Sequence, residues 1–440
     1  AFLSAINTYA SRKGNLRIYL LIDEYDNFTN TILSTYGTEF YRKATHGEGF
    51  IRGFFNVIKS ATTGTGAALE RLFITGVSPV TMDDVTSGFN IGTNITNDSW
   101  FNDLVGFSEN ELREMLEYYK EQGVLQESID EIVAMMKPNY DNYCFSEDTL
   151  EQCMFNSDMA LYFLKSFVLH HKKPKEIVDP NIRTDFNKLA YLIKLDHGLG
   201  ENFSVIKEIA EQGEIVTDIV THFSALEMTD PSNFKSLLFY FGLLSIKGVD
   251  MVGRPILHVP NLVVREQLFN FLIQGYIKHD IFKIDMNRMS ALFENMAFRG
   301  DWKPLFDFIA NAVREQSRIR EYIEGEAHIK GFLLAYLGMY RYYQLYPEYE
   351  LNKGFADFFF KPSLSVPVLP PFTYLLEVKY AKAGASEKEI RALADEAREQ
   401  LLRYSEDELV AEAKAKGELK LITIVWRSWE LALLEEVIFS

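Results

Sequence analysis

The sequence predicts a mixed α/β protein in three parts, and three observations carry that prediction. Two apolar, strand-like runs near the N-terminus flank a helical stretch. The middle of the chain is dominated by helical patterns, and the last third returns to strands separated by a long charged helix. We expect the boundaries at residues 1–107, 108–299 and 300–440. A chain of 440 residues is long for one domain, so we expect two or three domains.

In the first part, LRIYLLIDEYDN (16–27) has the pattern of a buried parallel strand that ends in acidic residues. RLFITGVSPV (71–80) predicts a second strand with Gly, Ser and Thr at its end. The helical stretch GEGFIRGFFNVIKSATTG (47–64) lies between them, so the expected unit is strand–helix–strand.

In the second part, SENELREMLEYYKEQG (108–123) predicts a helix that opens with a capping box formed by Ser108 and Glu111. Further on, the segments 232–248 and 256–276 predict a helix, short strands and a second helix, in the order of a winged-helix unit. The basic cluster HHKKPK (170–175) is expected to be a solvated loop.

In the third part, residues 320–343 predict a helix, and FADFFF (355–360) and YLLEVKY (374–380) predict two strands. The charged stretch 386–417 predicts a long helix, and ELKLITIVW (418–426) predicts a closing strand.

Composition limits the classes of protein that fit. Cys144 and Cys153 are the only cysteines, which excludes a disulfide framework and a cysteine-based zinc site. No apolar run approaches the ~18–20 residues of a membrane helix, and no leader peptide is evident, so we expect a protein of the reducing cytoplasm with no membrane partner. The net charge of −17 argues against a surface coated for nucleic acid, without excluding a local basic groove.

Acidic residues interrupt the two strands of the third part. Asp357 and Glu377 should lie on neighbouring strands, and Lys379 should share the face of Glu377 because strand side chains alternate. Two close carboxylates repel unless a cation lies between them, and carboxylate oxygens suit Mg²⁺ or Mn²⁺. The bland alternative is an exposed Glu–Lys pair on an amphipathic edge strand. The order of the elements favours a metal site with an ammonium beside the attacking water.

These motifs resemble those of bacterial AAA-ATPase-like proteins that carry a C-terminal PD-(D/E)XK nuclease-superfamily module. The matching segments are ELNKGFADFFF (350–360) around Asp357, LLEVKY (375–380), the Q-x-x-x-Y pair Gln400 and Tyr404, and the closing strand. The resemblance departs from the family at Phe355 and Ala356, where small or basic residues are common.

The resemblance implies a restriction-endonuclease-like domain with Asp357 and Glu377 as metal ligands and Lys379 as the residue that orients or activates water. It implies an acid on the preceding helix, for which Glu326 fits best and Glu324 is the rival. It further implies a metal contact from the backbone carbonyl of Val378. Gln400 and Tyr404 are assigned to substrate positioning or to structure.

The N-terminal part resembles a P-loop ATPase core. LLIDEYDN (20–27) resembles a Walker B strand, in which Asp23 would hold Mg²⁺ through water and Glu24 would polarise the hydrolytic water. Thr75 or Ser78 would be the sensor residue. No G-x-x-x-x-G-K-[ST] occurs, and TTGTGAAL (62–69) lacks the lysine, so we expect a truncated core that binds ATP only within a longer parent chain.

The expected function is Mg²⁺-dependent hydrolysis of phosphodiester bonds in nucleic acid, with DNA ahead of RNA as substrate. A basic strip should bind it, formed by Lys379, Lys382, Arg398 and Arg403. The alternative is a nucleotide-regulated switch or interaction protein with an inert nuclease fold. The apolar surface left by an incomplete ATPase core predicts either a homo-oligomer or a missing N-terminal segment that covers it.

Overall fold

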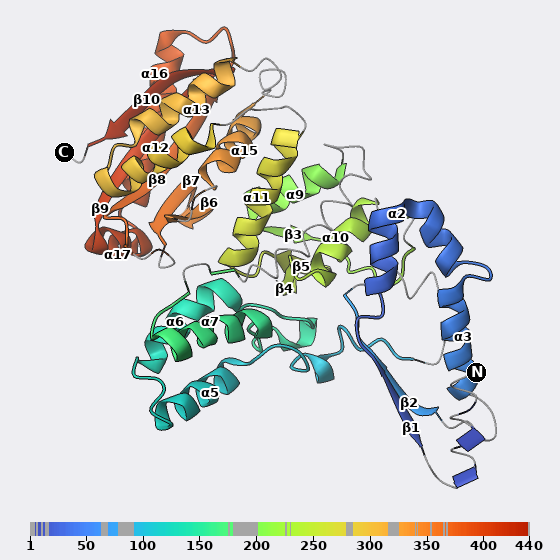
Figure 1. Cartoon of the computed structure of the whole chain (residues 1–440). Helices are drawn as coiled ribbons and strands as arrows, with labels where there is room; N and C mark the ends of the chain where they lie inside the picture. Colours follow the sequence, from blue (N-terminus) through green and yellow to red (C-terminus); the bar gives the residue numbers. More distant parts are fainter. Residues whose placement is uncertain are drawn as a thin grey trace.

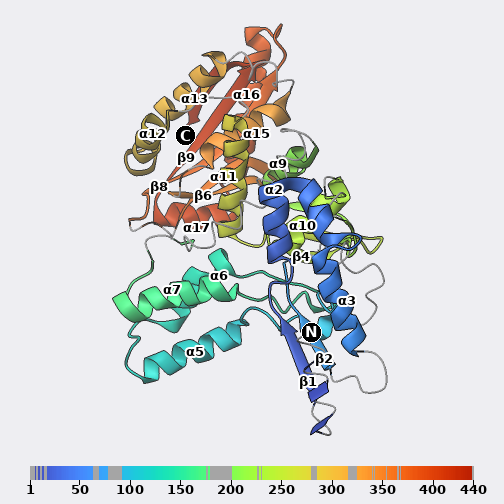
Figure 2. The same ribbon diagram turned by 45° about the vertical axis from the view of Figure 1, so that its right-hand side comes forward.

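Four groups of elements follow one another along the chain and occupy different parts of the molecule (Figure 1). The computed structural model describes residues 17–62, 69–77, 92–174, 201–224, 230–278, 285–315, 325–338, 342–352, 354–363 and 368–438, with residues 5, 8, 9, 12, 13, 177, 178, 227, 228, 340 and 366. The turned view in Figure 2 shows the same separation, with the C-terminal sheet at one end and the first two strands projecting at the other.

The N-terminal group is a parallel strand pair with two helices. Its elements are β1 (Ile18–Ile22), α2 (Asn27–Thr45), α3 (Phe50–Thr62) and β2 (Leu69–Ile74). Ile51, Phe55 and Ile58 are buried on one side of α3 because they recur at helical spacing. Tyr19 and Leu21 are exposed on β1, so one face of this pair is uncovered by the described residues. The strand–helix–strand expectation is confirmed, with α2 as an additional helix.

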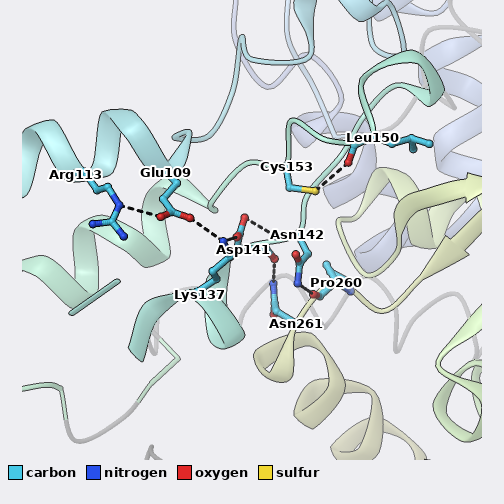
Figure 3. Close-up of polar contacts among 9 residues, drawn as sticks. All are labelled: Glu109, Arg113, Lys137, Asp141, Asn142, Leu150, Cys153, Pro260 and Asn261. Carbon is cyan, nitrogen blue, oxygen red and sulfur yellow. Dashed lines mark hydrogen bonds and ion pairs between the residues drawn. The ribbon is translucent and has the colours of Figure 1, made fainter. Parts of the chain in front are cut away.

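The second group is helical. It contains the 3-10 turns η1 (Ser99–Phe101) and η2 (Glu147–Thr149) and the helices α5 (Glu109–Glu121), α6 (Ile129–Tyr140) and α7 (Ser157–His170). The capping box of Ser108 and Glu111 is confirmed at the start of α5. Glu109 links α5 to α6, since it pairs with Arg113 at 2.9 Å and with Lys137 at 2.7 Å (Figure 3).

A small antiparallel sheet with three helices connects this group to the C-terminal part. Its elements are α9 (Glu201–Gln212), β3 (Glu214–Val216), α10 (Pro231–Tyr240), β4 (Ser245–Val249), β5 (Pro255–His258) and α11 (Leu262–Lys278), with strand order β3-β5-β4. Two amides fix the start of α11 to the end of α6 (Figure 3). Asn261 donates to the carbonyl of Asp141 at 3.1 Å, and Asn142 donates to the carbonyl of Pro260 at 2.9 Å.

The C-terminal group is a five-stranded mixed sheet with helices on both faces. Its elements are α12 (Met286–Arg299), α13 (Lys303–Glu315), α15 (Glu326–Leu337), β6 (Tyr343–Leu351), β7 (Gly354–Pro362), β8 (Phe372–Ala381), α16 (Glu387–Tyr404), α17 (Glu408–Lys416), β9 (Glu418–Arg427) and β10 (Glu430–Val437). The strand order is β10-β9-β8-β7-β6, and β8 and β9 are parallel while the other neighbours are antiparallel.

Three sequence expectations for this group were wrong. The sheet has two additional edge strands, β6 and β10, and the helix expected over 320–343 ends at Leu337, so that β6 starts at Tyr343. The single charged helix expected over 386–417 is broken after Tyr404 into α16 and α17, and Asp407 caps the second helix through the backbone N–H of Leu409. A helix with an Ala/Glu/Lys-rich composition gives little signal for such a break.

The two faces of the central strand β8 belong to different cores. Tyr374, Leu376 and Val378 pack into a large cluster that continues through α15 and α11 to α9. Leu375 packs on the opposite face with Leu401 of α16. Among the described helices, none combines the length and the apolar character needed to cross a membrane.

Candidate active site

A row of polar side chains crosses the otherwise apolar sheet. The ladder between β7 and β8 ends at the pair Phe358–Leu376, and Asp357 and Glu377 are the next residues of the two strands beyond it. The two carboxylates are close enough for the charge of Asp357 to raise the pKa of Glu377. Glu377 in turn pairs with Thr423 of β9. On the other side, the pairs that flank Asp357 place Glu348 of β6 next to it.

Both central carboxylates are buried, and Asp357 is held from two directions. Asp357 and Glu377 are each 3% exposed. The backbone N–H of Val378 donates to Oδ2 of Asp357 at 2.6 Å, and the ammonium of Lys330 pairs with Oδ1. Burial raises the pKa of Asp357, and Lys330 and the Val378 N–H offset this only in part.

Lys330 of α15 is the cation at the centre of this group. Its Nζ lies 3.1 Å from Glu326 and 3.0 Å from Glu348, in addition to its pair with Asp357. Burial acts to lower the pKa of Lys330, but the nearby carboxylates outweigh it and the pKa is raised. Lys330 therefore stays charged and neutralises acids that would otherwise repel one another.

Glu377 is less well satisfied. Its Oε1 lies 3.3 Å from Nζ of Lys379, but its Oε2 is buried and has no hydrogen-bond partner among the described residues. Burial raises the pKa of Glu377, the charge of Asp357 raises it further, and Lys379 opposes both. Lys379 is also shared with Glu396 of α16, at 3.1 Å.

An oxygen of this kind suits a hard cation. Mg²⁺ is usually held by one or two carboxylates together with water and substrate oxygens. The buried, unpartnered Oε2 of Glu377 beside Asp357 fits that donor set. No three His, Cys, Asp or Glu side chains within the described residues converge closely enough to hold a metal ion. The ammonium of Lys330 draws the outer acids, Glu326 and Glu348, onto itself instead.

The structure places the other residues of the predicted nuclease site unevenly. Glu326 is the first residue of α15 and is 41% exposed, whereas its rival Glu324 lies outside the described residues. The Oε1 of Gln400 is buried and has no hydrogen-bond partner in the described part of the chain. Tyr404 is 2% exposed and lies against the start of β7, where a Cβ on Gly354 would come within 2.5 Å of its hydroxyl. This contact gives Tyr404 a packing role.

The expected basic strip is only partly available. Lys379 is engaged by two carboxylates, and the guanidinium of Arg403 lies over the ring of Tyr404, with Cζ 5.1 Å from the ring centroid. Lys382 and Arg398 are exposed and form no ion pair within the described residues.

The acids of the N-terminal part lie at the end of β1. Thr75, which follows β2, donates its hydroxyl to Asp23 at 2.5 Å, and Glu24 is exposed beside it. Asp26, to which the sequence assigned no role, is 1% exposed and accepts the N–H of Val77 at 3.1 Å. Ser78 and residues 63–68 lie outside the described residues.

Sequence reasoning missed Lys330, Glu348, Glu396 and Thr423. Lys330 could have been found, because it lies four residues after Glu326 on one helix face. Glu348 was missed because its strand was taken for the end of a helix and a loop.

Two family models match the regions of the chain that contain these two groups of acids. Residues 324–436 match the model described as PD-(D/E)XK nuclease superfamily, and residues 1–86 match the model described as predicted AAA-ATPase. A search of curated proteins gave no match. The chain thus carries a PD-(D/E)XK nuclease superfamily domain at its C-terminal end and an AAA-ATPase-like region at its N-terminal end.

Proposed function

We propose that the C-terminal domain hydrolyses phosphodiester bonds of nucleic acid with the help of Mg²⁺ or Mn²⁺ held by Asp357 and Glu377. The observation that carries the proposal is the pairing of two buried carboxylates, one of which keeps an oxygen without a partner. A divalent cation bound there would supply charge stabilisation and a more acidic bound water.

The protein side chains around this pair have separate tasks. Lys379 carries a charge fixed between Glu377 and Glu396, which suits it to orient the attacking water and to attract the phosphate oxygens. The N–H of Val378 fixes the orientation of Asp357. Glu326 lies at the exposed rim, where it can act as an accessory base once Lys330 releases it.

The direct test is cleavage of a supercoiled plasmid, with RNA of matched length as a parallel substrate, at increasing Mg²⁺ or Mn²⁺. Asp357→Asn, Glu377→Gln and Lys379→Met should each lower the rate by roughly 10²–10³-fold, the loss typical of removing one electrostatic stabiliser. Glu430→Gln and Lys388→Met change exposed residues of the same domain and serve as matched controls. Equal cleavage rates for the wild type and Glu377→Gln would show that this site does not catalyse the cleavage.

A second candidate is an interaction protein with an inert nuclease fold. The observation in its favour is Lys330, whose ammonium already balances Asp357 without a metal ion. This candidate predicts that calorimetry detects no Mn²⁺ binding and that the plasmid stays intact under all conditions. We rank it second because it does not explain why Oε2 of Glu377 is buried without a hydrogen-bond partner.

A further inference from the structure

A second polar site lies away from the carboxylates, at the junction of the helical part and the C-terminal sheet. It is a cavity of about 50 Å³ between α6, α11, the end of α15 and the edge strand β6. Its lining includes Asn139, Arg265, Phe269, Tyr343 and Gln344. One water needs about 10–15 Å³ by this measure, so the cavity has room for one small polar group.

Arg265 carries a charge into this cavity without an anionic partner. Its Nη1 is buried and has no hydrogen-bond partner among the described residues. Within the described part of the chain no carboxylate pairs with it, and its guanidinium lies over the ring of Tyr346, with Cζ 5.0 Å from the ring centroid. A buried guanidinium is costly unless it is paired, and the ring replaces only part of its hydration.

The remaining lining is suited to an oxyanion. The side-chain oxygen of Gln344 accepts the hydroxyl of Tyr346 at 2.9 Å, which leaves the amide hydrogens of Gln344 as donors. Glu266, the other charged lining residue, is engaged in an interaction of its own. The donors therefore come from two elements, α11 and β6.

The site is also held in place. Arg265 lies one helical turn after Asn261, which caps α11 by accepting the N–H of Val264 at 3.2 Å. Two hydrogen bonds, from Asn261 to the carbonyl of Asp141 and from Asn142 to the carbonyl of Pro260, fix this end of α11 to α6 (Figure 3). A guanidinium positioned in advance loses little freedom when it binds an anion.

We propose that this cavity binds a phosphate group through Arg265. The size of the cavity fits one tetrahedral oxyanion, and a guanidinium matches the geometry of phosphate oxygens. The group could come from free phosphate or from the backbone of a nucleic acid. The site is separate from the proposed nuclease chemistry and does not depend on it.

Thermal unfolding and calorimetry with inorganic phosphate, at ionic strength held constant with chloride, test the proposal. We expect saturable binding that raises the melting temperature of the wild type, loss of this shift in Arg265→Met, and at least tenfold weaker binding in Arg265→Lys. Arg254→Gln, which removes an exposed arginine paired with Asp250, is the matched control and should keep the shift.

A short oligonucleotide, added without divalent metal, distinguishes the sources of the phosphate. If only the oligonucleotide raises the melting temperature, and the rise depends on Arg265, the site binds backbone phosphate. If inorganic phosphate raises it, the site binds the free ion. In phosphate-free buffer Arg265→Met should be at least as stable as the wild type, since it removes an unpaired buried charge. The proposal is overturned if neither probe shifts the wild type, or if Arg265→Met folds and keeps the shift.

Discussion

The two regions that match family models both place acidic side chains beside strands, but they surround them differently. In the C-terminal sheet, Asp357 and Glu377 are buried and two lysines neutralise them. At the N-terminal strand pair, Asp23 and Glu24 are exposed, and Asp23 is bound by the hydroxyl of Thr75. Water can solvate the second pair, whereas the first depends on charged partners supplied by the fold.

The difference shows how the same residue type acquires different chemistry. Burial raises the pKa of both C-terminal carboxylates, and each lysine carries a raised pKa in return. Such mutual perturbation is typical of functional sites. It also makes the C-terminal site sensitive to the loss of any one charge.

The largest expected contrast between the two regions is in local stability. Amides of β8 should exchange with solvent at least ~10³-fold more slowly than those of β1, because β8 is covered on both faces while Tyr19 and Leu21 are exposed on β1. Hydrogen exchange followed by mass spectrometry of peptides measures both strands in one experiment. Equal protection would show that another surface covers β1 in solution.

Removal of Lys330 should produce the next largest effect. Lys330→Met leaves the acid of Asp357 buried without its cation, and we expect a loss of about 3–5 kcal/mol in the free energy of unfolding, measured with urea. Mn²⁺ should restore part of this loss and bind more tightly than to the wild type, since it no longer competes with an ammonium.

Lys43→Met is the matched control for that variant. Lys43 forms an exposed pair with Glu39 at 2.7 Å, so its removal should leave stability within error. A small effect at Lys330 as well would mean that water reaches Asp357 and that burial does not govern this site.

The pH dependence of stability should follow Glu377. Its folded pKa is raised to about 8, mainly by burial, so the folded state holds a proton that the unfolded state loses near 4.5. The stability linked to this proton is complete below about pH 4.5 and is lost as the pH rises through 8. Glu377→Gln should flatten the fall in stability between pH 5 and pH 8, compared with Glu430→Gln. An unchanged slope would contradict the assignment.

The sequence was sufficient for the elements that carry strong patterns. The apolar runs around Asp357 and Glu377 predicted the neighbouring strands β7 and β8. The alternation of side chains along a strand predicted that Glu377 and Lys379 share one face, and the two side chains do contact each other. Their burial also removes the alternative of an exposed Glu–Lys pair on an edge strand, because β8 is central. Metal binding and catalysis at these residues stay predictions.

The edge strands and the cation were not predictable in the same way. Strand β6 contains Pro347 and several polar residues, as edge strands often do, and this composition does not distinguish it from a loop. Lys330 acquires its role from the packing of α15 against the sheet, which brings it beside Glu348 and Asp357. The i,i+4 spacing marks Lys330 as a partner of Glu326, but its contacts with Glu348 and Asp357 join distant segments and leave no mark in a local pattern.

The smallest expected effect is on the free energy of unfolding when one threonine of each region is replaced by valine. Thr75→Val removes the hydroxyl that binds Asp23, and we expect a loss of about 0.5–1.5 kcal/mol, as for a typical hydrogen bond. Thr373 of β8 is buried, and its hydroxyl has no partner among the described residues. Thr373→Val should therefore be neutral or stabilising, because valine has the same shape and no unsatisfied group. Urea unfolding of both variants decides the comparison. If Thr373→Val is the more damaging change, the hydroxyl of Thr373 has a hydrogen-bond partner in solution.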